Sequence, residues 1–189
     1  MCRPEIENEE HQARSKPEGV SRMLPYPQSF GIEDRERVFR FLATFFRWEC
    51  ALKHNGFSRS GAHGQAEPDW KAFAVAHDTA IKALQVPEFV AARDVLLSNP
   101  PRREVFQENQ IVWVDNPRRL HETADADYLL RVVRDVRNNL FHGGKFVRGS
   151  APELARDQML IDSAVAVLEV LARLHSGIRA MHDQSIYSS

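Results

Sequence analysis

The chain has 189 residues and a formal net charge of −1, with 43% hydrophobic and 27% charged residues, which is the composition of an ordinary globular domain. Near-neutral charge excludes a polycation, so any affinity for nucleic acid must come from a local patch. Two cysteines, Cys2 and Cys50, are too few for a disulfide framework and favour a reducing compartment, the cytoplasm. The polar N-terminus lacks the apolar region of a secretory signal, and the longest apolar stretch, 159–174, carries three charged residues, so no membrane span is expected.

We expect residues 1–27 to form a mobile N-terminal arm, residues 28–184 to form one helical domain, and residues 185–189 to form a tail. The first helix is predicted from about Glu33 to Asn55, where Asn55-Gly56 stops it. Its apolar residues recur with the spacing of one buried face: Val38, Phe41, Leu42, Phe45 and Leu52.

A loop over 56–65 leads to Glu67-Pro68-Asp69, a helix start, and the following helix is expected to bury Trp70, Phe73, Ile81 and Leu84. Pro87 opens a shorter helix that runs to about Ser98. Residues 99–121 break the helical pattern. Pro100-Pro101 oppose a helix, and the β-branched and aromatic run 111–114, with Val105-Phe106 before it, predicts a small hairpin.

A further helix begins at Thr123 or Asp125, runs to about Phe141 and ends at Gly143-Gly144. Ser150 to Glu153 has the spacing of a capping box and starts the last helix, which is expected to extend to about His182. The predicted fold is therefore all-α: an antiparallel bundle of four long helices, with one shorter helix and a small hairpin inserted.

The helix over 125–141, called the motif helix below, has two faces. Leu129, Val133, Val136 and Leu140 form its apolar side, and Asp135, Asn138 and His142 lie opposite with Arg131 and Arg134. Arg137 lies on the flank, where its long side chain reaches towards His142. This pair is expected in solvent or against a second copy of the chain.

Residues 131–148 hold five basic side chains and one acid, Asp135, a locally positive strip suited to a phosphate backbone. The alternative is a solvated outer helix face with no ligand. The basic residues are Arg131, Arg134, Arg137, Lys145 and Arg148.

The sequence Arg137-Asn138-x-x-x-His142-Gly143 resembles the Arg-x4–6-His signature of the HEPN superfamily, late in the penultimate long helix. The chain also resembles a group of short plasmid- or chromosome-encoded bacterial HEPN proteins of unknown role, in residues 45–53, in Gly56-Phe57 and in residues 67–70. The resemblance covers about residues 30–180. Gly144 departs from the pattern, because some HEPN toxins carry there a tyrosine that a partner nucleotidyltransferase modifies.

The resemblance implies a metal-independent ribonuclease without a cofactor, acting as a homodimer through the motif helix in a toxin, phage-defence or stress-response role. Arg137 and His142 are the implied catalytic residues, and Asn138 is their helper. RNA-binding residues would be Arg131, Arg134, Lys145 and Arg148. Expected partners are RNA, a second copy and, as a candidate, an antitoxin protein. A non-catalytic module that binds RNA or nucleotide, or mediates protein association, is the main alternative, and a purely structural bundle is the third.

Metal-free RNA cleavage needs a base for the 2′-hydroxyl, an acid for the leaving 5′-oxygen and positive charge at the phosphorane. His142 is expected to act as base or acid, and Arg137 to bind the developing charge. One histidine cannot easily do both in one step, so two protomers would supply two. Products should carry a 2′,3′-cyclic phosphate or 3′-phosphate and a 5′-hydroxyl, and EDTA should not inhibit.

Residues outside the motif helix offer three further candidates. Glu49 interrupts the apolar stripe of the first helix, where a buried carboxylate needs a partner. It is expected to orient Arg137 or another basic residue of the motif helix without touching RNA itself. The alternative is that its side chain reaches solvent or a backbone donor. His77 is expected to be a hydrogen-bonded core histidine rather than a cleft residue. Cys50 and His54 have the spacing of a metal or nucleophile pair, but no matching ligands accompany them, and no metal is expected.

Overall fold

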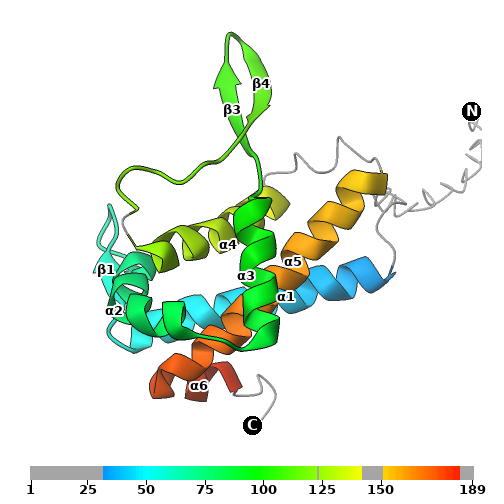
Figure 1. Ribbon diagram of the computed structural model, residues 1–189. Helices are drawn as coiled ribbons and strands as arrows, with labels where there is room; N and C mark the ends of the chain where they lie inside the picture. The colour runs from blue at the N-terminus through cyan, green and yellow to red at the C-terminus, as the bar shows by residue number, and fades with distance from the viewer. Residues whose placement is uncertain (1–31, 123, 142–150, 184–189) are drawn as a thin grey trace, which may run out of the picture.

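A computed structural model describes residues 32–122, 124–141 and 151–183 (Figure 1). The predicted arm 1–27, the tail 185–189, the cap Thr123, the Gly143-Gly144 helix end and Ser150 of the capping box lie outside these residues. The described part is mostly helical, which confirms the expected all-α fold with a small hairpin. Its helices are α1 (Ile32–His54), α2 (Trp70–Ala83), α3 (Pro87–Ser98), α4 (Asp125–Phe141), α5 (Ala151–Leu171) and α6 (Ser176–Asp183), with a 3₁₀ turn, η2 (Ala172–Leu174), before α6.

One hydrophobic core joins the helices. Helix α5 packs against both α1 and α3, and α2 packs against α4. Trp48 of α1 is fully buried, stacks on Trp70 with ring centroids 5.8 Å apart, and donates from Nε1 to the Leu168 carbonyl at 2.9 Å. Because burying an indole N–H without an acceptor is costly, this bond fixes α5 against α1. Of the stripe predicted on α1, Phe41, Phe45 and Leu52 are buried, while Val38 and Leu42 are half-buried.

The predicted start of α2 is confirmed, because Asp69 caps the helix by accepting a hydrogen bond from the Ala72 amide at 2.9 Å. The preceding loop contains a feature that the sequence did not indicate. Strands β1 (Ser58–Ser60) and β2 (Ala66–Pro68) pair antiparallel, and Gly64 takes a φ of +77° in the turn between them. These strands are short and largely exposed, so they lack the alternation of apolar and polar residues by which a strand is predicted from sequence.

The prediction of one long last helix is wrong. The chain leaves the helix at η2, and His175 is extended with φ −134° and ψ 118° before α6 begins. The reason is tertiary: α6 turns back against α1, and Gly177 lies so close to Asn55 that an added Cβ would stand 1.8 Å from its Oδ1. A larger residue at position 177 would therefore have to displace the Asn55 side chain, so glycine favours this close helix crossing.

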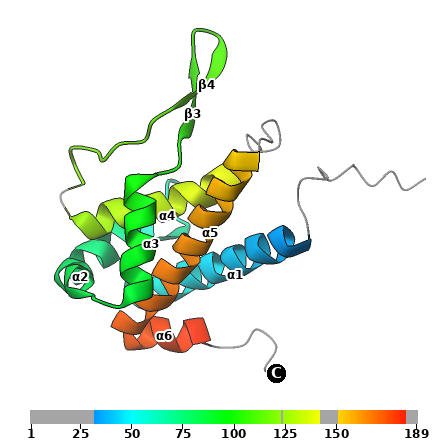
Figure 2. The same ribbon diagram turned by 45° about the vertical axis from the view of Figure 1, so that its right-hand side comes forward.

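The predicted hairpin over 103–114 is confirmed as β3 (Arg103–Gln107) and β4 (Gln110–Val114). Glu108 and Asn109 both have positive φ, as a two-residue type I′ turn requires. Figures 1 and 2 show the hairpin projecting from the helices on two extended legs.

In the described part of the chain, no helix is long and apolar enough to cross a membrane.

Candidate functional site

Arg137, the first candidate catalytic residue, lies near the C-terminal end of α4 and is half-buried. Its guanidinium carbon stands 5.4 Å from the centroid of the Phe45 ring of α1, within cation–π distance. Its NH1 group donates to Oδ1 of Asn138 at 3.0 Å. The structure thus brings together Arg137 and Asn138, two of the three residues expected to act in catalysis, and supports the arginine on an aromatic ring that the sequence indicated only as core.

Arg134 is exposed one turn earlier on α4. Desolvation of the guanidinium is the largest influence on its pKa and lowers it; the charge of Asp135 opposes this effect, and the charge of Arg59 adds to it. An arginine remains protonated near neutral pH in spite of such a shift. Arg59, on β1, is therefore a cation close enough to influence Arg134 that sequence reasoning missed, and it pairs with Glu67 of β2 at 3.0 Å.

Glu49 is half-buried on α1, and its charge raises the pKa of Arg134, against the net shift. Its carboxylate therefore acts electrostatically on a basic residue of the motif helix. Whether Glu49 orients Arg137 stays a prediction.

Arg131, which the sequence placed opposite the apolar side of the motif helix as an expected RNA-binding residue, is buried. Its side chain is 8% exposed and its guanidinium pairs with Glu122, whose side chain is 2% exposed. Arg131 also donates to Oδ1 of Asn116 at 2.7 Å, to Asp135 at 2.8 Å and to the Pro117 carbonyl at 2.9 Å. Because the N–H groups of its guanidinium bond these internal acceptors, Arg131 stabilises the fold and is not positioned to bind a phosphate in this structure.

The pKa values of the pair agree with a strong internal bond. Desolvation opposes ionisation of Glu122, but hydrogen bonds from Arg131 and the Arg119 amide outweigh it, so the pKa of Glu122 is lowered. Desolvation likewise disfavours the charged form of Arg131, and the hydrogen bond with Glu122 overcomes it, so the pKa of Arg131 is raised. Both groups are charged at neutral pH.

Arg131 belongs to a polar stripe on α4 that holds the legs of the β3–β4 hairpin. Asp135, one turn on, accepts from Asn116 Nδ2 at 2.8 Å. Asn139, another turn on, donates to the Arg102 carbonyl at 2.6 Å. Three residues spaced by four along one helix therefore fix both legs, and this use of the outer face was not predicted.

Three of the predicted site residues, His142, Lys145 and Arg148, lie outside the described residues. By sequence, His142 directly follows Phe141, the last residue of α4.

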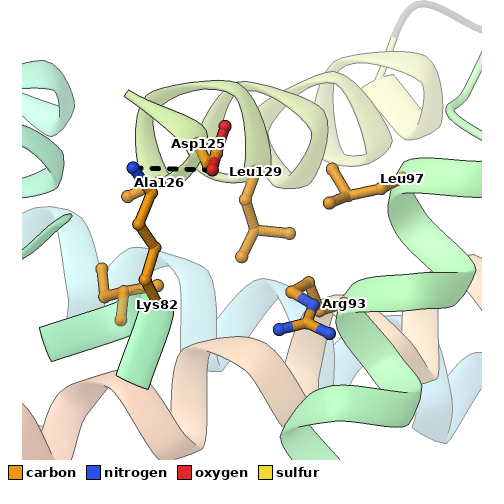
Figure 3. A pocket seen from close by; sticks show the side chains of 7 residues that line it. Lys82, Arg93, Leu97, Asp125, Ala126 and Leu129 are labelled. Carbon is orange, nitrogen blue, oxygen red and sulfur yellow. Dashed lines mark ion pairs between the residues drawn. The ribbon is translucent and has the colours of Figure 1, made fainter. Parts of the chain in front are cut away.

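A pocket of about 180 Å³ lies at the other end of α4 (Figure 3), between α2, α3 and α4. Lys82 and Arg93 line it, but each cation has a carboxylate partner: Lys82 pairs with Asp78 at 2.7 Å, and Arg93 with Asp94 at 2.8 Å. Figure 3 also shows Lys82 reaching Asp125, 3.6 Å away. Because these charges are already neutralised, the pocket gives no indication of an anionic ligand.

His77 is confirmed as a hydrogen-bonded, partly buried histidine. Its Nδ1 lies 3.0 Å from the Phe73 carbonyl, and its ring stacks on the Phe73 ring with centroids 4.2 Å apart.

No protein-family model, curated protein or solved structure matches this chain. The candidate site therefore stands on its own residues and on the resemblance of its motif.

Proposed function

We propose that the chain is a metal-independent endoribonuclease of HEPN type that cleaves RNA by attack of the 2′-hydroxyl, in a toxin, phage-defence or stress-response role. Arg137 and His142 are its catalytic residues, and Asn138 is their helper. The observation that carries the proposal is the position of Arg137. Its guanidinium contacts the Phe45 ring and the Asn138 side chain, and Arg137 precedes His142 by five residues.

Preorganisation is the physical reason that this position matters. A guanidinium held before the substrate arrives needs little reorganisation when charge develops, and electrostatic stabilisation of this kind usually contributes most to the rate enhancement of an enzyme. Its planar fork of donors matches two oxygens of a phosphate. Phe45 holds the arginine from one side, and the Asn138 side chain accepts one of its N–H groups. Arg134, one turn earlier on the same helix, adds positive charge, which favours the approach of a polyanion.

The proposed reaction has one step in which bonds change. The 2′-oxygen attacks phosphorus and gives its proton to one histidine, while the 5′-oxygen leaves with a proton from another. The products are a 2′,3′-cyclic phosphate and a 5′-hydroxyl. His142 from each of two copies supplies the base and the acid, and Arg137 binds the charge on the phosphorane. An antitoxin protein would be the natural partner of such an enzyme.

Purified chain incubated with mixed RNA in EDTA should degrade it, and Arg137→Ala or His142→Ala should lower the rate at least about 100-fold, as loss of a general acid–base or an oxyanion donor does. Arg173→Ala is the matched control, because Arg173 is an exposed arginine on η2, and its rate should equal that of the wild type. Circular dichroism checks that each variant is folded.

If neither the wild type nor the two variants degrade RNA, the nuclease proposal is contradicted. If the inert wild type nevertheless binds RNA and Arg134→Ala weakens the binding, the non-catalytic module is the better account. In bacteria, expression of the wild type but not of His142→Ala should arrest growth, which tests the toxin role.

A further inference from the structure

The β3–β4 hairpin exposes apolar side chains far from the core. Phe106 and Ile111 are cross-strand partners that are 74% and 67% exposed, and on the same face Trp113 pairs with Glu104. Among the described residues this sheet consists of these two strands, and each packs chiefly against the other. An isolated two-stranded hairpin is marginally stable in water, so this arm gains from a surface that covers it.

The base of the hairpin, in contrast, is firmly held. Asn139 of α4 bonds the Arg102 carbonyl at 2.6 Å, Asn116 bonds the Pro101 carbonyl at 3.3 Å, and Arg156 of α5 bonds the Pro100 carbonyl at 2.8 Å. Such anchoring fixes the direction of the arm. A pre-oriented arm loses less conformational entropy when it docks.

The chemistry of the arm favours a protein surface over nucleic acid. Over residues 103–114 the charged side chains are Arg103, Glu104 and Glu108, so the arm carries a net negative charge that does not attract phosphates. Large exposed apolar side chains, set on a fixed element, are instead typical of a protein interface.

Helix α1 carries an apolar face that fits this arm. Phe39 is 71% exposed and Phe46, two turns on, is 46% exposed, with the half-buried Leu42 and Ala43 between them. This α1 face borders the core stripe of the same helix at Leu42, while Phe39 and Phe46 remain exposed. In both Figure 1 and Figure 2 the hairpin stands clear of α1, so the arm does not cover this face within one molecule.

We infer that the β3–β4 arm docks on the α1 face of a second copy of this chain, each copy giving one arm and receiving the other's. Large apolar side chains bury about 150–250 Å² each, so the exposed parts of Phe106, Ile111, Phe39 and Phe46, with Trp113, supply roughly 500 Å² per copy. Because interfaces are a little over half apolar, this corresponds to roughly 800–900 Å² per partner, the size of a stable interface. Reciprocal exchange also closes the assembly as a two-fold dimer.

Sedimentation equilibrium of the full chain tests the inference, and it does not depend on nuclease activity. The wild type should dimerise in the micromolar range. The double variant Phe106→Ser/Ile111→Ser and the single variant Phe39→Ser should each raise the dimer Kd at least about 30-fold, as loss of a central apolar anchor does. Val75→Ser is the matched control, because Val75 is 56% exposed on α2, and its Kd should not change. Unaltered far-ultraviolet circular dichroism and a cooperative thermal transition show that these surface variants are folded.

A second arm of the experiment tests the contact itself. Cys50 is a free, exposed cysteine on α1, one turn beyond Phe46. In a Cys2→Ser background, Gln107→Cys should form a disulfide-linked dimer on mild oxidation, and Arg173→Cys should not.

Three results would overturn the inference. One is a wild type that stays monomeric at 100 µM concentrations. Another is a dimer that the hairpin variants leave intact, which would assign association to another surface, such as the face of α4 with Arg137. The third is a monomer that dimerises once residues 1–31 are deleted, which would assign the α1 face to the chain's own N-terminal segment.

Discussion

Removing the charge of Glu122 gives the sharpest test of the fold that positions the candidate site. Glu122→Gln keeps the shape of the side chain but leaves Arg131, 8% exposed, without its closest carboxylate. Breaking a buried ion pair from one side costs about 3–5 kcal/mol. Asp135 remains 2.8 Å from the guanidinium, so we expect the lower end, about 3 kcal/mol. Arg131→Met should cost more, about 4 kcal/mol, because the carboxylate of Glu122 then stays buried without a cation.

Urea denaturation followed by circular dichroism measures the loss, and thermal unfolding should show a Tm about 6–12 °C lower for Glu122→Gln, at roughly 2–4 °C per kcal/mol for a chain of this size. In the double variant Glu122→Leu/Arg131→Met, the loss should be smaller than the sum of the single losses, because neither partner of the Glu122–Arg131 pair remains as a buried unpaired charge. A loss below about 0.5 kcal/mol for either single variant, the size expected of an exposed residue, would refute the reasoning and make Arg131 available again as a cation for RNA.

Further predictions concern pH, a helix start and the core. The pKa of Glu122 is lowered in the folded state, so its pair with Arg131 stabilises the fold above pH 4.5, the pKa of the unfolded chain, and this effect is lost as pH falls through the folded pKa. The difference in unfolding free energy between wild type and Glu122→Gln should therefore shrink from pH 7 to pH 3. A constant difference would contradict the assignment. Asp78 accepts from the Ala126 amide at the start of α4 at 3.2 Å and pairs with Lys82, so Asp78→Ala should cost about 1 kcal/mol, whereas Lys82→Ala should cost less. Trp48→Phe should cost about 2 kcal/mol in urea denaturation, because the variant loses the bond to the Leu168 carbonyl and leaves a gap in the core; an unchanged midpoint would argue against that bond.

Local patterns in the sequence were sufficient for most of the helices and for one hairpin. The apolar spacing of α1, the cap at Asp69 and the β-branched run at 111–114 each reflect an interaction between near neighbours, and such interactions are visible in a single stretch of chain. The same holds for Arg137 and Asn138, which are adjacent in sequence and bonded in the structure.

What could not be predicted depends on residues far apart in the sequence. Helical periodicity separated Arg131 from the core stripe of α4, but it could not reveal that the leg containing Asn116 and Glu122 covers that face. The break before α6 accompanies the packing of α6 against α1, where Gly177 lies close to Asn55, more than a hundred residues earlier. The apolar spacing through Ile178 alone predicts a continuous helix. Periodicity shows which face is polar and not what covers it.

End-group analysis of the RNA products tests the central claim most directly. Incubated with a defined RNA oligonucleotide in EDTA, the wild type should give fragments that end in a 2′,3′-cyclic phosphate or 3′-phosphate and begin with a 5′-hydroxyl. Arg137→Ala and His142→Ala should give none at the same concentration, and a single 2′-deoxy substitution at the cleaved position should protect the oligonucleotide. Fragments with 5′-phosphates, cleavage of the deoxy-substituted bond, or intact RNA after incubation with folded wild type would contradict the proposed mechanism.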